Sequence, residues 1–484
     1  MTPVTRKLVA VLRQNVAPSG ACWRLALIAA VALLVSASSA AALEPGFRQL
    51  DGRHLTLITD LGAKEDLDEL PKTFDAAFPL WCRYFGLDAD KLADWHVTGY
   101  LMKSREHFER AGYWQDGLPP FLNGFSAGQK FWLYDQASPY YRRHLLLHEG
   151  VHSFMYLLLG QGGPPGYMEG MAELLASHHW QDGQLQVGYF PASSGEVQQL
   201  GRIEIIQNAV KAGHRRGLAD VLTMRGLTVI DNDIYGWSWG MAAFLDGHPR
   251  YRDRFRTLHR LLRSADFEPQ FRRLFAADWD RLNAEWQAFV ATVDYGYDFD
   301  RMAIDFRPGK PPAAGEGRAT IDSDRGWQST ALHVEAGKTY ELSATGRYQL
   351  VREPAVWWCE PGGVTIRYNQ GQPLGILLGV VDPDRQTPAA PADSEPGDAP
   401  SAETLPRKTL PRKSPPADTA PAAQLAAADA VADPWARPIV IGLHTTLSPA
   451  HSGTLYLRVN DPAGELADNS GKVELTVREV AAKP

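Results

Sequence analysis

The sequence has few cysteines, and none has the neighbours that a catalytic or cross-linking role requires. Its 484 residues include three, Cys22, Cys82 and Cys359. Cys22 lies in a predicted targeting segment, and the other two fall in what we predict to be different domains. We therefore expect a free, buried thiol at Cys82 and at Cys359 rather than a disulfide bridge between them.

A strong charge of either sign is also lacking. The formal net charge is −7, and 22% of the residues are charged. This small acidic excess gives no electrostatic footprint for nucleic acid or for an anionic membrane. The hydrophobic fraction of 44% is ordinary for a globular protein, and the length leaves room for two or three domains.

Long apolar runs are missing except at the N-terminus. Residues 25–35 are apolar and are followed by small residues up to Ala42; the basic residues before them are Arg6, Lys7, Arg13 and Arg24. This pattern is typical of a secretory signal peptide, residues 1–42. An uncleaved anchor is the weaker alternative, because a bilayer span needs about 20 apolar residues. We expect an exported protein (periplasmic, cell-surface or secreted) without a transmembrane segment after cleavage.

Residues 43–307 combine strand and helix patterns. Alternation predicts strands at 54–60, 95–102 and 129–135, and helical spacing predicts helices at 64–85 (with Pro71 as a break or kink), 105–112, 197–212, 218–223, 237–245, 250–263 and 278–293. Strands early and helices later predict an α+β domain. The strand at 129–135 lies just before the predicted metal site, so by analogy with zinc peptidases it borders the substrate cleft.

The pattern changes after a linker at 308–316. Short alternating segments predict a β-sandwich at 317–484, with strands at 327–334, 339–348, 363–368, 374–381, 439–443, 453–459 and 472–480. An insert at about 382–434 is rich in proline and alanine and repeats Thr-Leu-Pro-Arg-Lys at 404–408 and 409–413. Because it has few large apolar residues, we predict a disordered loop between two strands.

The strongest motif is His148-Glu149-Gly150-Val151-His152, an H-E-x-x-H pentapeptide in an apolar helical run at 140–177. Histidines four apart project from one face of a helix, where they can share one zinc ion, and Glu149 can act as general base. Catalytic zinc takes three protein ligands and a water. Glu169, which opens a second helical pattern, is the expected third ligand.

Three further residues have two open interpretations each. His144 lies one turn before His148 on the same face and is either a further ligand or, as we expect because three ligands and a water complete the site, a packing residue or support for a ligand. Glu173 either accepts a hydrogen bond from a ligand imidazole or is a first-turn glutamate favoured by the helix dipole. Tyr235 either donates to the transition state or is a core tyrosine bonded to the backbone.

The motifs resemble those of the gluzincin metallopeptidases. HEGVH followed by GYMEGMAE is similar to their H-E-x-x-H and E-G-x-A-E, most closely to the peptidase-MA-like group, and the resemblance covers about residues 43–305. It implies a zincin-like fold, with His148, His152 and Glu169 as zinc ligands and Glu149 as base. The segment 235–238, Tyr-Gly-Trp-Ser, matches a downstream Tyr-x-x-Ser of that group, which implies Tyr235 as the donor.

A loop between the last two predicted strands gathers hard oxygen ligands. Its polar residues are Asn460, Asp461, Glu465, Asp468 and Asn469. Such a cluster suits calcium. The alternative, that these residues only form a turn, is equally compatible with the composition.

This second domain resembles the PA-I type galactose-binding calcium lectins. The similar segments are V-N-D and D-N-S-G in the loop, with GWQST at 326–330 and VEAGK at 334–338. The resemblance implies calcium ligation by the side chains of Asp461, Asp468 and Asn469 and by the backbone carbonyl of Glu465. Residues 357–368 have no clear copy of the lectins' sugar-contacting segment, so calcium is better supported than sugar.

Two functions follow as hypotheses. The first is a secreted zinc metallopeptidase that acts on protein or peptide and carries a calcium-binding, lectin-like domain for docking on glycans. The second is a non-catalytic glycan-binding or adhesion protein with an inactive zincin scaffold. The intact Glu149 favours the first, because a zincin without its base cannot activate water.

Overall fold

The computed structural model describes residues 43–160, 163–224, 232–384 and 433–480. The predicted signal peptide and most of the predicted insert lie outside these residues. The chain divides into two compact units, 1–49 and 50–484, and all that follows concerns the second unit. In the described residues, no helix has the length and apolar character needed to cross a membrane.

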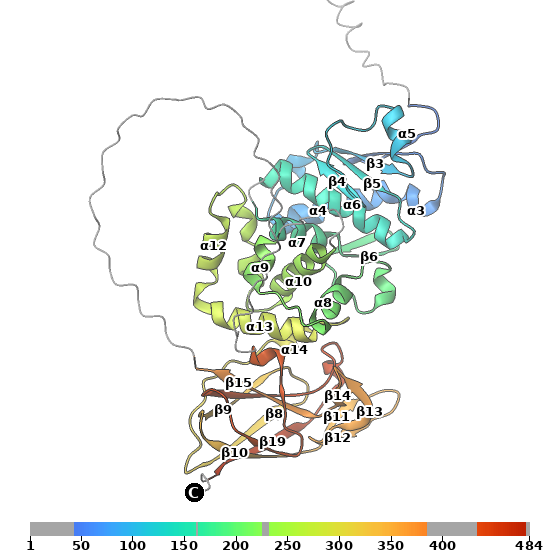
Figure 1. Cartoon of the computed structure of the whole chain (residues 1–484). Coiled ribbons are helices and arrows are strands. Elements are labelled where there is room, and N and C mark those ends of the chain that lie inside the picture. The colour runs from blue at the N-terminus through green and yellow to red at the C-terminus, as the bar shows by residue number, and fades with distance from the viewer. Residues whose placement is uncertain (1–42, 161–162, 225–231, 385–432, 481–484) are drawn as a thin grey trace, which may run out of the picture. The chain divides into compact units, whose positions relative to one another are not determined.

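The second unit consists of an α+β region (residues 50–307, here the mixed region) followed by a β region (residues 308–480) (Figure 1). The mixed region contains a sheet in which β2 (Leu55–Thr59), β3 (Val97–Met102), β5 (Lys130–Tyr134) and β4 (Gly124–Ala127) run in this order; β1 (Arg48–Asp51) precedes them in the chain. The strands β2, β3 and β5 are parallel, and β4 is antiparallel to β5. The edge next to β5 is therefore β4, a strand that the sequence analysis missed.

Helices make up the rest of the mixed region. They are α3 (Glu65–Asp68), α4 (Leu70–Phe85), α5 (Arg105–Arg110), α6 (Pro139–Phe154), α7 (Pro165–Ala176), α8 (Arg202–Lys211), α9 (Leu218–Thr223), α10 (Asp233–Gly247), α11 (Arg252–Phe255), α12 (Phe267–Leu274), α13 (Trp279–Thr292) and α14 (Phe299–Met302). A hairpin of β6 (His178–Gln181) and β7 (Gln184–Val187) interrupts them. Their buried faces share one core with the sheet.

Several predicted helices differ from the observed ones. The predicted helix at 64–85 is two helices, and Pro71 lies in the first turn of α4, where a missing N–H costs nothing. The predicted helix at 250–263 is broken into α11 and a 3₁₀ turn at Leu258–Leu261. The predicted start of α8, at residue 197, is five residues early, and α12 and the β6–β7 hairpin were missed.

The β region contains two four-stranded antiparallel sheets. One has the order β17 (His444–Leu447), β10 (Thr339–Thr345), β19 (Lys472–Val480) and β8 (Glu316–Asp322), and the other β16 (Ile439–Val440), β15 (Leu377–Pro383), β18 (Gly453–Val459) and β9 (Gln328–Val334). Two small hairpins join β11 (Tyr348–Val351) to β12 (Trp357–Cys359) and β13 (Val364–Asn369) to β14 (Gln372–Leu374). Apolar residues of both four-stranded sheets form one core.

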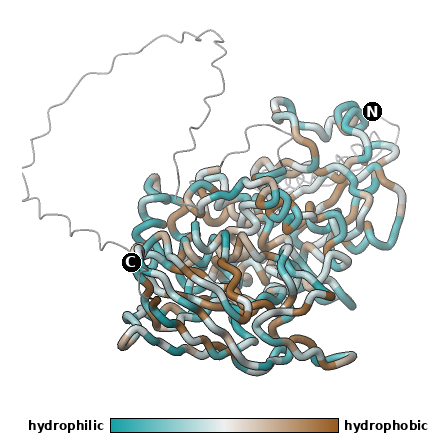
Figure 2. Tube along the Cα trace, turned by 60° about the horizontal axis from the view of Figure 1, so that its bottom comes forward, coloured by the Kyte–Doolittle hydropathy of each residue, from teal (hydrophilic) through white to brown (hydrophobic). Residues whose placement is uncertain are grey.

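Burial in the β region follows the period of two that a strand imposes. Along β10 and β19 buried and more exposed side chains alternate, and the tube in Figure 2 changes between teal and brown along the strands. The strands at 453–459 and 472–480 have the predicted bounds, whereas β8 and β17 were missed. β8 begins inside the predicted linker 308–316, and Lys310 of that linker exchanges backbone hydrogen bonds with β9. Cys82 and Cys359 are buried and free, as expected.

Candidate metal centre

The histidines of the predicted site lie on α6. The helix starts at a favourable cap, because the Ser138 hydroxyl accepts a hydrogen bond from the Tyr141 N–H at 3.3 Å and Pro139 occupies the first turn. It continues through both histidines into a π-helical turn at Met155–Leu159. His148 and His152 therefore project from one face, one turn apart.

Close helix packing brings α7, which carries Glu169, to this face (Figure 1). A Cβ on Gly150 of α6 would lie 2.4 Å from the Phe74 ring of α4, and one on Gly170 of α7 would lie 2.7 Å from the Ser238 carbonyl of α10. Only glycine permits these approaches. The position of Glu169 opposite the histidines is thus set by α7 packing tightly on α10.

Three ligand atoms form a small triangle at this point. The Nε2 atoms of His148 and His152 are 3.1 Å apart, and each is 3.4 Å from Oε2 of Glu169. A tetrahedral zinc ion with bonds of about 2.0–2.1 Å needs ligand atoms roughly 3.3–3.4 Å apart. Oε2 of Glu169 is buried and has no hydrogen-bond partner among the described residues. The residues fit a zinc ion.

The charges of the triangle depend on one another. Burial works against the charged form of His148, but Glu169 and Glu173 raise its pKa well above the ordinary value. Burial would raise the pKa of Glu169, yet His152 and His148 hold it well below its usual range. In the absence of a metal the cluster thus pairs a protonated imidazole with a carboxylate, and a cation would replace that proton.

Glu173 supports the first histidine. Its Oε1 lies 3.3 Å from Nδ1 of His148, and its Oε2 lies 3.1 Å from Nε2 of His144. Arg202 of α8 donates to both oxygens, from Nε at 2.8 Å and from Nη2 at 2.9 Å. A carboxylate bonded to the second nitrogen of a ligand imidazole fixes the orientation of the ring. The structure therefore places Glu173 and His144 behind the ligands.

A second set of residues, His144, His148 and Glu173, also offers three ligand atoms close together. The Arg202 guanidinium decides against a cation there, because it already neutralises Glu173 with two charge-assisted hydrogen bonds. Glu169 has no such partner. A metal ion is therefore favoured by His148, His152 and Glu169.

Glu149, the predicted base, is buried beside the edge strand β4. A Cβ on Gly124 of β4 would lie 2.4 Å from Oε1 of Glu149, so glycine at this position makes room for the carboxylate. Burial raises the pKa of Glu149 to about 7, although His148 and His152 act in the opposite direction. A carboxylate with a pKa near neutrality can both accept and return a proton at physiological pH.

Tyr235 reaches the same site from the first turn of α10. Its ring is 6.0 Å from the His148 ring, edge to face, and the Arg202 guanidinium lies 5.3 Å from its centroid. Burial and the charge of Glu169 raise the pKa of Tyr235, so its hydroxyl stays protonated. None of the described residues forms a hydrogen bond with that hydroxyl. The structure thus brings the predicted residues His148, Glu149, His152 and Glu169 together with Tyr235.

Two features of the centre were missed in the sequence. Arg202 lies 29 residues from Glu173, and nothing in the local pattern of α8 distinguishes it from a surface arginine. The edge strand β4 is short and half-buried, so it lacks the alternation that identifies a strand. A glycine directly before the Phe-Ser-Ala of β4 is the one local signal, because glycine in a strand often marks a close approach.

The predicted calcium loop lies between β18 and β19, around a 3₁₀ turn, η7 (Leu466–Asp468). Nδ2 of Asn469 donates to Oδ2 of Asp461 at 2.8 Å. The Oδ1 atoms of Asp461, Asp468 and Asn469 are all buried without a hydrogen-bond partner among the described residues. Buried unpaired oxygens are costly, and three on one loop fit a calcium ion.

Glu465 of this loop has its side chain engaged elsewhere. Its Oε1 accepts a hydrogen bond from Nη2 of Arg367 at 2.6 Å. The predicted role of its backbone carbonyl is compatible with this arrangement. Asn460 is used structurally, since its Nδ2 donates to the carbonyls of Asn369 and Pro373 and so ties the loop to the β13–β14 hairpin.

Comparisons with known proteins add little. No family model matches the chain, and no curated protein matches it. One matching solved structure is described as "EclA N-terminal domain; PllA-like lectin", with 14% sequence identity and a TM-score of 0.20, covering 35% of this chain and 100% of that chain. A TM-score this low carries no argument about fold or function.

Proposed function

We propose that this protein is an exported zinc-dependent peptidase. The observation that carries the proposal is the triangle of His148 Nε2, His152 Nε2 and Glu169 Oε2, with edges of 3.1, 3.4 and 3.4 Å beside a buried Glu149. Zinc held there would supply a Lewis acid that polarises the scissile carbonyl and a water molecule.

The protein's own groups have distinct tasks in this proposal. Glu149 accepts a proton from the attacking water and returns it to the leaving amine, for which a pKa of about 7 is suited. Tyr235 is protonated, its hydroxyl has no hydrogen-bond partner among the described residues, and it donates a hydrogen bond to the developing oxyanion. Glu173 and Arg202 keep the His148 ring in place.

The substrate is proposed to be an extended peptide. β4 is the terminal strand of the sheet, its residues are half-buried and Gly124 lies beside Glu149. An edge strand can offer its outer backbone groups to an added strand. Backbone pairing of this kind is largely independent of substrate sequence. The edge is β4, and not the strand at 129–135 that the sequence analysis favoured.

The β region is proposed to bind calcium through Asp461, Asp468, Asn469 and the carbonyl of Glu465, and through this module to hold the enzyme on glycans. The three unpartnered oxygens of the loop support the calcium part. The glycan part rests on the sequence resemblance alone. Retention of the full chain on galactose-bearing beads in calcium, and its release by chelator, would test it.

The decisive experiment compares the wild type with Glu149→Gln in zinc-loaded full chain, using casein and a pool of quenched fluorescent peptides. We expect a loss of activity of roughly 10²–10⁴-fold. Zinc content, measured by elemental analysis, should stay at one per chain in Glu149→Gln and fall in His148→Ala.

Glu268→Gln is the matched control, because Glu268 lies on the surface of α12 and, among the described residues, forms an ion pair only with Arg272. It should leave activity unchanged. Equal proteolysis by Glu149→Gln and wild type would contradict the peptidase assignment. Calcium-dependent glycan binding with no proteolysis by either would instead favour the non-catalytic adhesion protein.

A further inference from the structure

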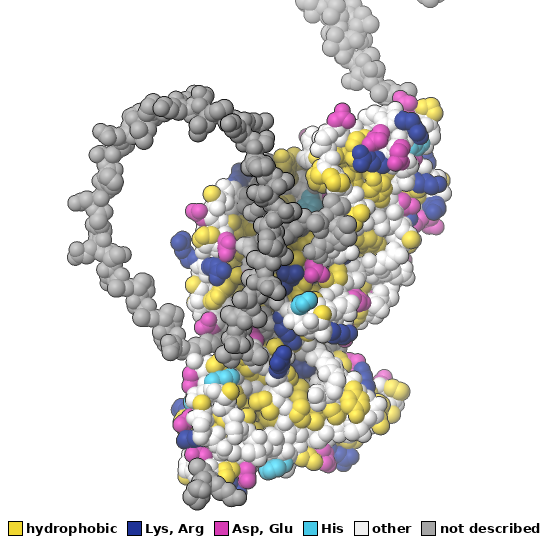
Figure 3. All heavy atoms as spheres, viewed as in Figure 1, with side chains coloured by type: hydrophobic (Ala, Val, Ile, Leu, Met, Phe, Trp, Pro, Cys, Tyr) yellow, Lys and Arg dark blue, Asp and Glu magenta, His cyan; other side chains and the backbone are white. Residues whose placement is uncertain are grey.

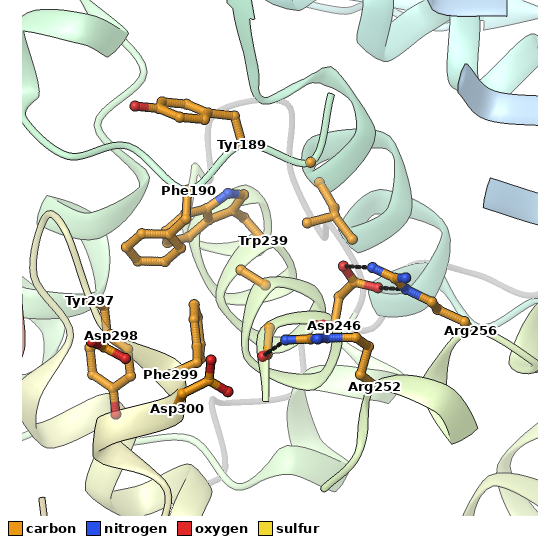
Figure 4. Close-up of a pocket in the computed structure, with 14 residues that line it drawn as sticks. Tyr189, Phe190, Trp239, Asp246, Arg252, Arg256, Tyr297, Asp298, Phe299 and Asp300 are labelled. Carbon is orange, nitrogen blue, oxygen red and sulfur yellow. Dashed lines mark hydrogen bonds and ion pairs between the residues drawn. The ribbon is translucent and has the colours of Figure 1, made fainter. Parts of the chain in front are cut away.

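Two cavities of the second unit differ in whether their charged groups have partners. The first, of about 380 Å³, is lined by aromatic side chains such as Phe190 and Trp239 and by charged groups of α10 and α11 (Figure 4). Asp246 accepts from Arg256 at 2.7 and 3.0 Å, and Arg252 donates to backbone carbonyls at the end of α10. These three charges are satisfied internally, and of the other two acidic lining residues Asp298 pairs with Arg301 and Asp300 is exposed to solvent, so no buried charge there lacks a partner.

The second cavity, of about 610 Å³, is larger and differs in this respect. It lies between α8 and α13 on one side and β15, β18, the loop at 460–463, the β13–β14 turn and the 3₁₀ turn η6 (Pro434–Ala436) on the other, with Trp327 directly before β9. In Figure 3 several Lys and Arg side chains, in dark blue, lie over α8, α13 and the adjoining β region. The volume is within the range of small-molecule sites, about 300–1,000 Å³.

Arg458 of β18 is the unusual group of this cavity. Only 3% of its surface is exposed, and both Nε and Nη1 lack a hydrogen-bond partner among the described residues. Its one hydrogen bond is long, from Nη2 to the Asp461 carbonyl at 3.5 Å. The guanidinium lies 5.4 Å from the centre of the Trp327 ring. An arginine stays charged in a protein, so this cation is buried without a counter-ion.

The carboxylates nearby do not supply that counter-ion. Asp461 directs Oδ2 to Asn469, and Glu465 is paired with Arg367. Within the part of the chain that the structure describes, no ion pair joins Arg458 to an acidic side chain. A buried charge that lacks a partner strongly favours the binding of an opposite charge.

Two other basic residues line the cavity and are progressively less buried. Arg215 is half-buried, donates from Nη2 to the Ala436 carbonyl at 3.3 Å and leaves Nη1 unpartnered. Lys211, at the end of α8, is exposed. A cleft with one sign of charge concentrates the opposite ion. The acidic lining residues are Asp294, which is exposed, and Asp461.

The remaining walls are apolar. Trp327 and Trp435 are almost completely buried, and Val290, Val293 and Leu378 lie beside them. We propose that this cavity binds a small organic anion, whose carboxylate or phosphate group pairs with Arg458 and whose apolar part packs against Trp327 and Trp435. None of the lining residues belongs to the zinc site, whereas Asp461 of the proposed calcium loop also lines this cavity.

The test measures binding to the full chain by calorimetry and by tryptophan fluorescence, with benzoate and phenyl phosphate as probes and benzamide and phenol as their uncharged counterparts. We expect each anion to bind at least tenfold more tightly than its counterpart. The stronger of the two anions identifies the preferred head group. Arg458→Gln should abolish the preference, and Arg215→Gln should weaken anion binding several-fold.

Arg318→Gln is the matched control, because Arg318 is exposed on β8. Its substitution removes the same charge from the same region. Anions that bind to zinc contribute equally in every variant, because no residue of the zinc site lines this cavity. If Arg458→Gln does not fold, Lys211→Gln combined with Arg215→Gln decides. The proposal would be overturned if the wild type showed no preference for the anions, or if the preference persisted after these substitutions.

Discussion

The proposed zinc cluster and the loop at 460–469 both bury polar side chains, but they differ in how many of these have partners. Behind the zinc ligands, Glu173 has four nitrogen neighbours, from Arg202, His144 and His148. In the loop, Asp461, Asp468 and Asn469 each keep one buried oxygen without a partner. The residues behind the proposed zinc ligands thus satisfy one another, whereas Oε2 of Glu169 and the three loop oxygens are left for a cation.

The difference follows from the elements that carry the residues. The zinc ligands stand on α6 and α7, whose positions are set by helix packing, so the protein itself holds the ligand atoms together. The loop has one short 3₁₀ turn, and Asn460 and Asn469 tie it to neighbouring segments. Its three buried oxygens without a partner lower the stability of the metal-free loop, and a bound cation would remove this cost. We therefore expect metal removal to affect activity in one region and stability in the other.

The largest effect on stability is expected from breaking the support of the zinc cluster. Arg202→Met would leave the Glu173 carboxylate buried with only the two histidines. We expect a loss of about 3–5 kcal/mol in the free energy of unfolding and zinc binding weaker by about 10–100-fold. Urea denaturation and zinc competition with a chromogenic chelator would measure the two effects.

Arg256→Met provides the control for this prediction. Arg256 also donates from two nitrogens to a carboxylate, that of Asp246. Its side chain, however, is 45% exposed. Its loss should cost at most about 1 kcal/mol. If Arg202→Met is too unstable to purify, the double variant with Glu173→Gln should recover folding, because it removes the unpaired charge. Equal costs for the two arginines would show that the burial of the pair is unimportant.

The sequence predicted local features well and distant ones poorly. The pentapeptide at 148–152 and Glu169 were found because a period of four and two consecutive helices determine their geometry. The bounds of α9, β18 and β19 were also correct, since glycine or turn residues flank them. By contrast, Arg202 and Arg458 look like any surface arginine until the partners contributed by distant segments are known. Their burial is a property of the tertiary structure alone.

The split of the predicted helix at 250–263 has a similar cause. Its apolar spacing is helical, but buried Tyr251 and Phe255 pack among α10, α12 and α13, and the chain turns to place them. Tertiary packing here overrides local propensity. The same reasoning explains why β4 was missed, because pairing with β5 and space for Glu149 define that strand.

A smaller effect is expected from calcium on the loop. A ligand at 100 times its dissociation constant stabilises the native state by about 2.7 kcal/mol. Calcium should therefore raise the unfolding midpoint of the wild type and protect amides 460–469 from hydrogen exchange, and Asn469→Ala should remove both effects. Asn283→Ala is the control, because Asn283 donates to a carbonyl within α13 and lies outside the loop. Calcium stabilisation that persists in Asn469→Ala would contradict the assigned ligand.

The smallest effect, on pH dependence, separates the loop from the zinc cluster most cleanly. Burial raises the pKa of Asp461 to about 7, whereas an aspartate in an unfolded chain has a pKa of about 3.9. Between these two pKa values the folded state holds a proton that the unfolded state has lost. In the presence of a chelator, the free energy of unfolding should therefore fall as the pH rises from about 4 to about 7. The fall is at most about 1.4 kcal/mol per pH unit. Comparing urea midpoints at pH 5 and pH 6 measures this change. Asp461→Asn should remove this pH dependence, and calcium should cancel it by pairing with the carboxylate. If the free energy of unfolding changes equally with pH in wild type and in Asp461→Asn, Asp461 is ionised in the metal-free loop.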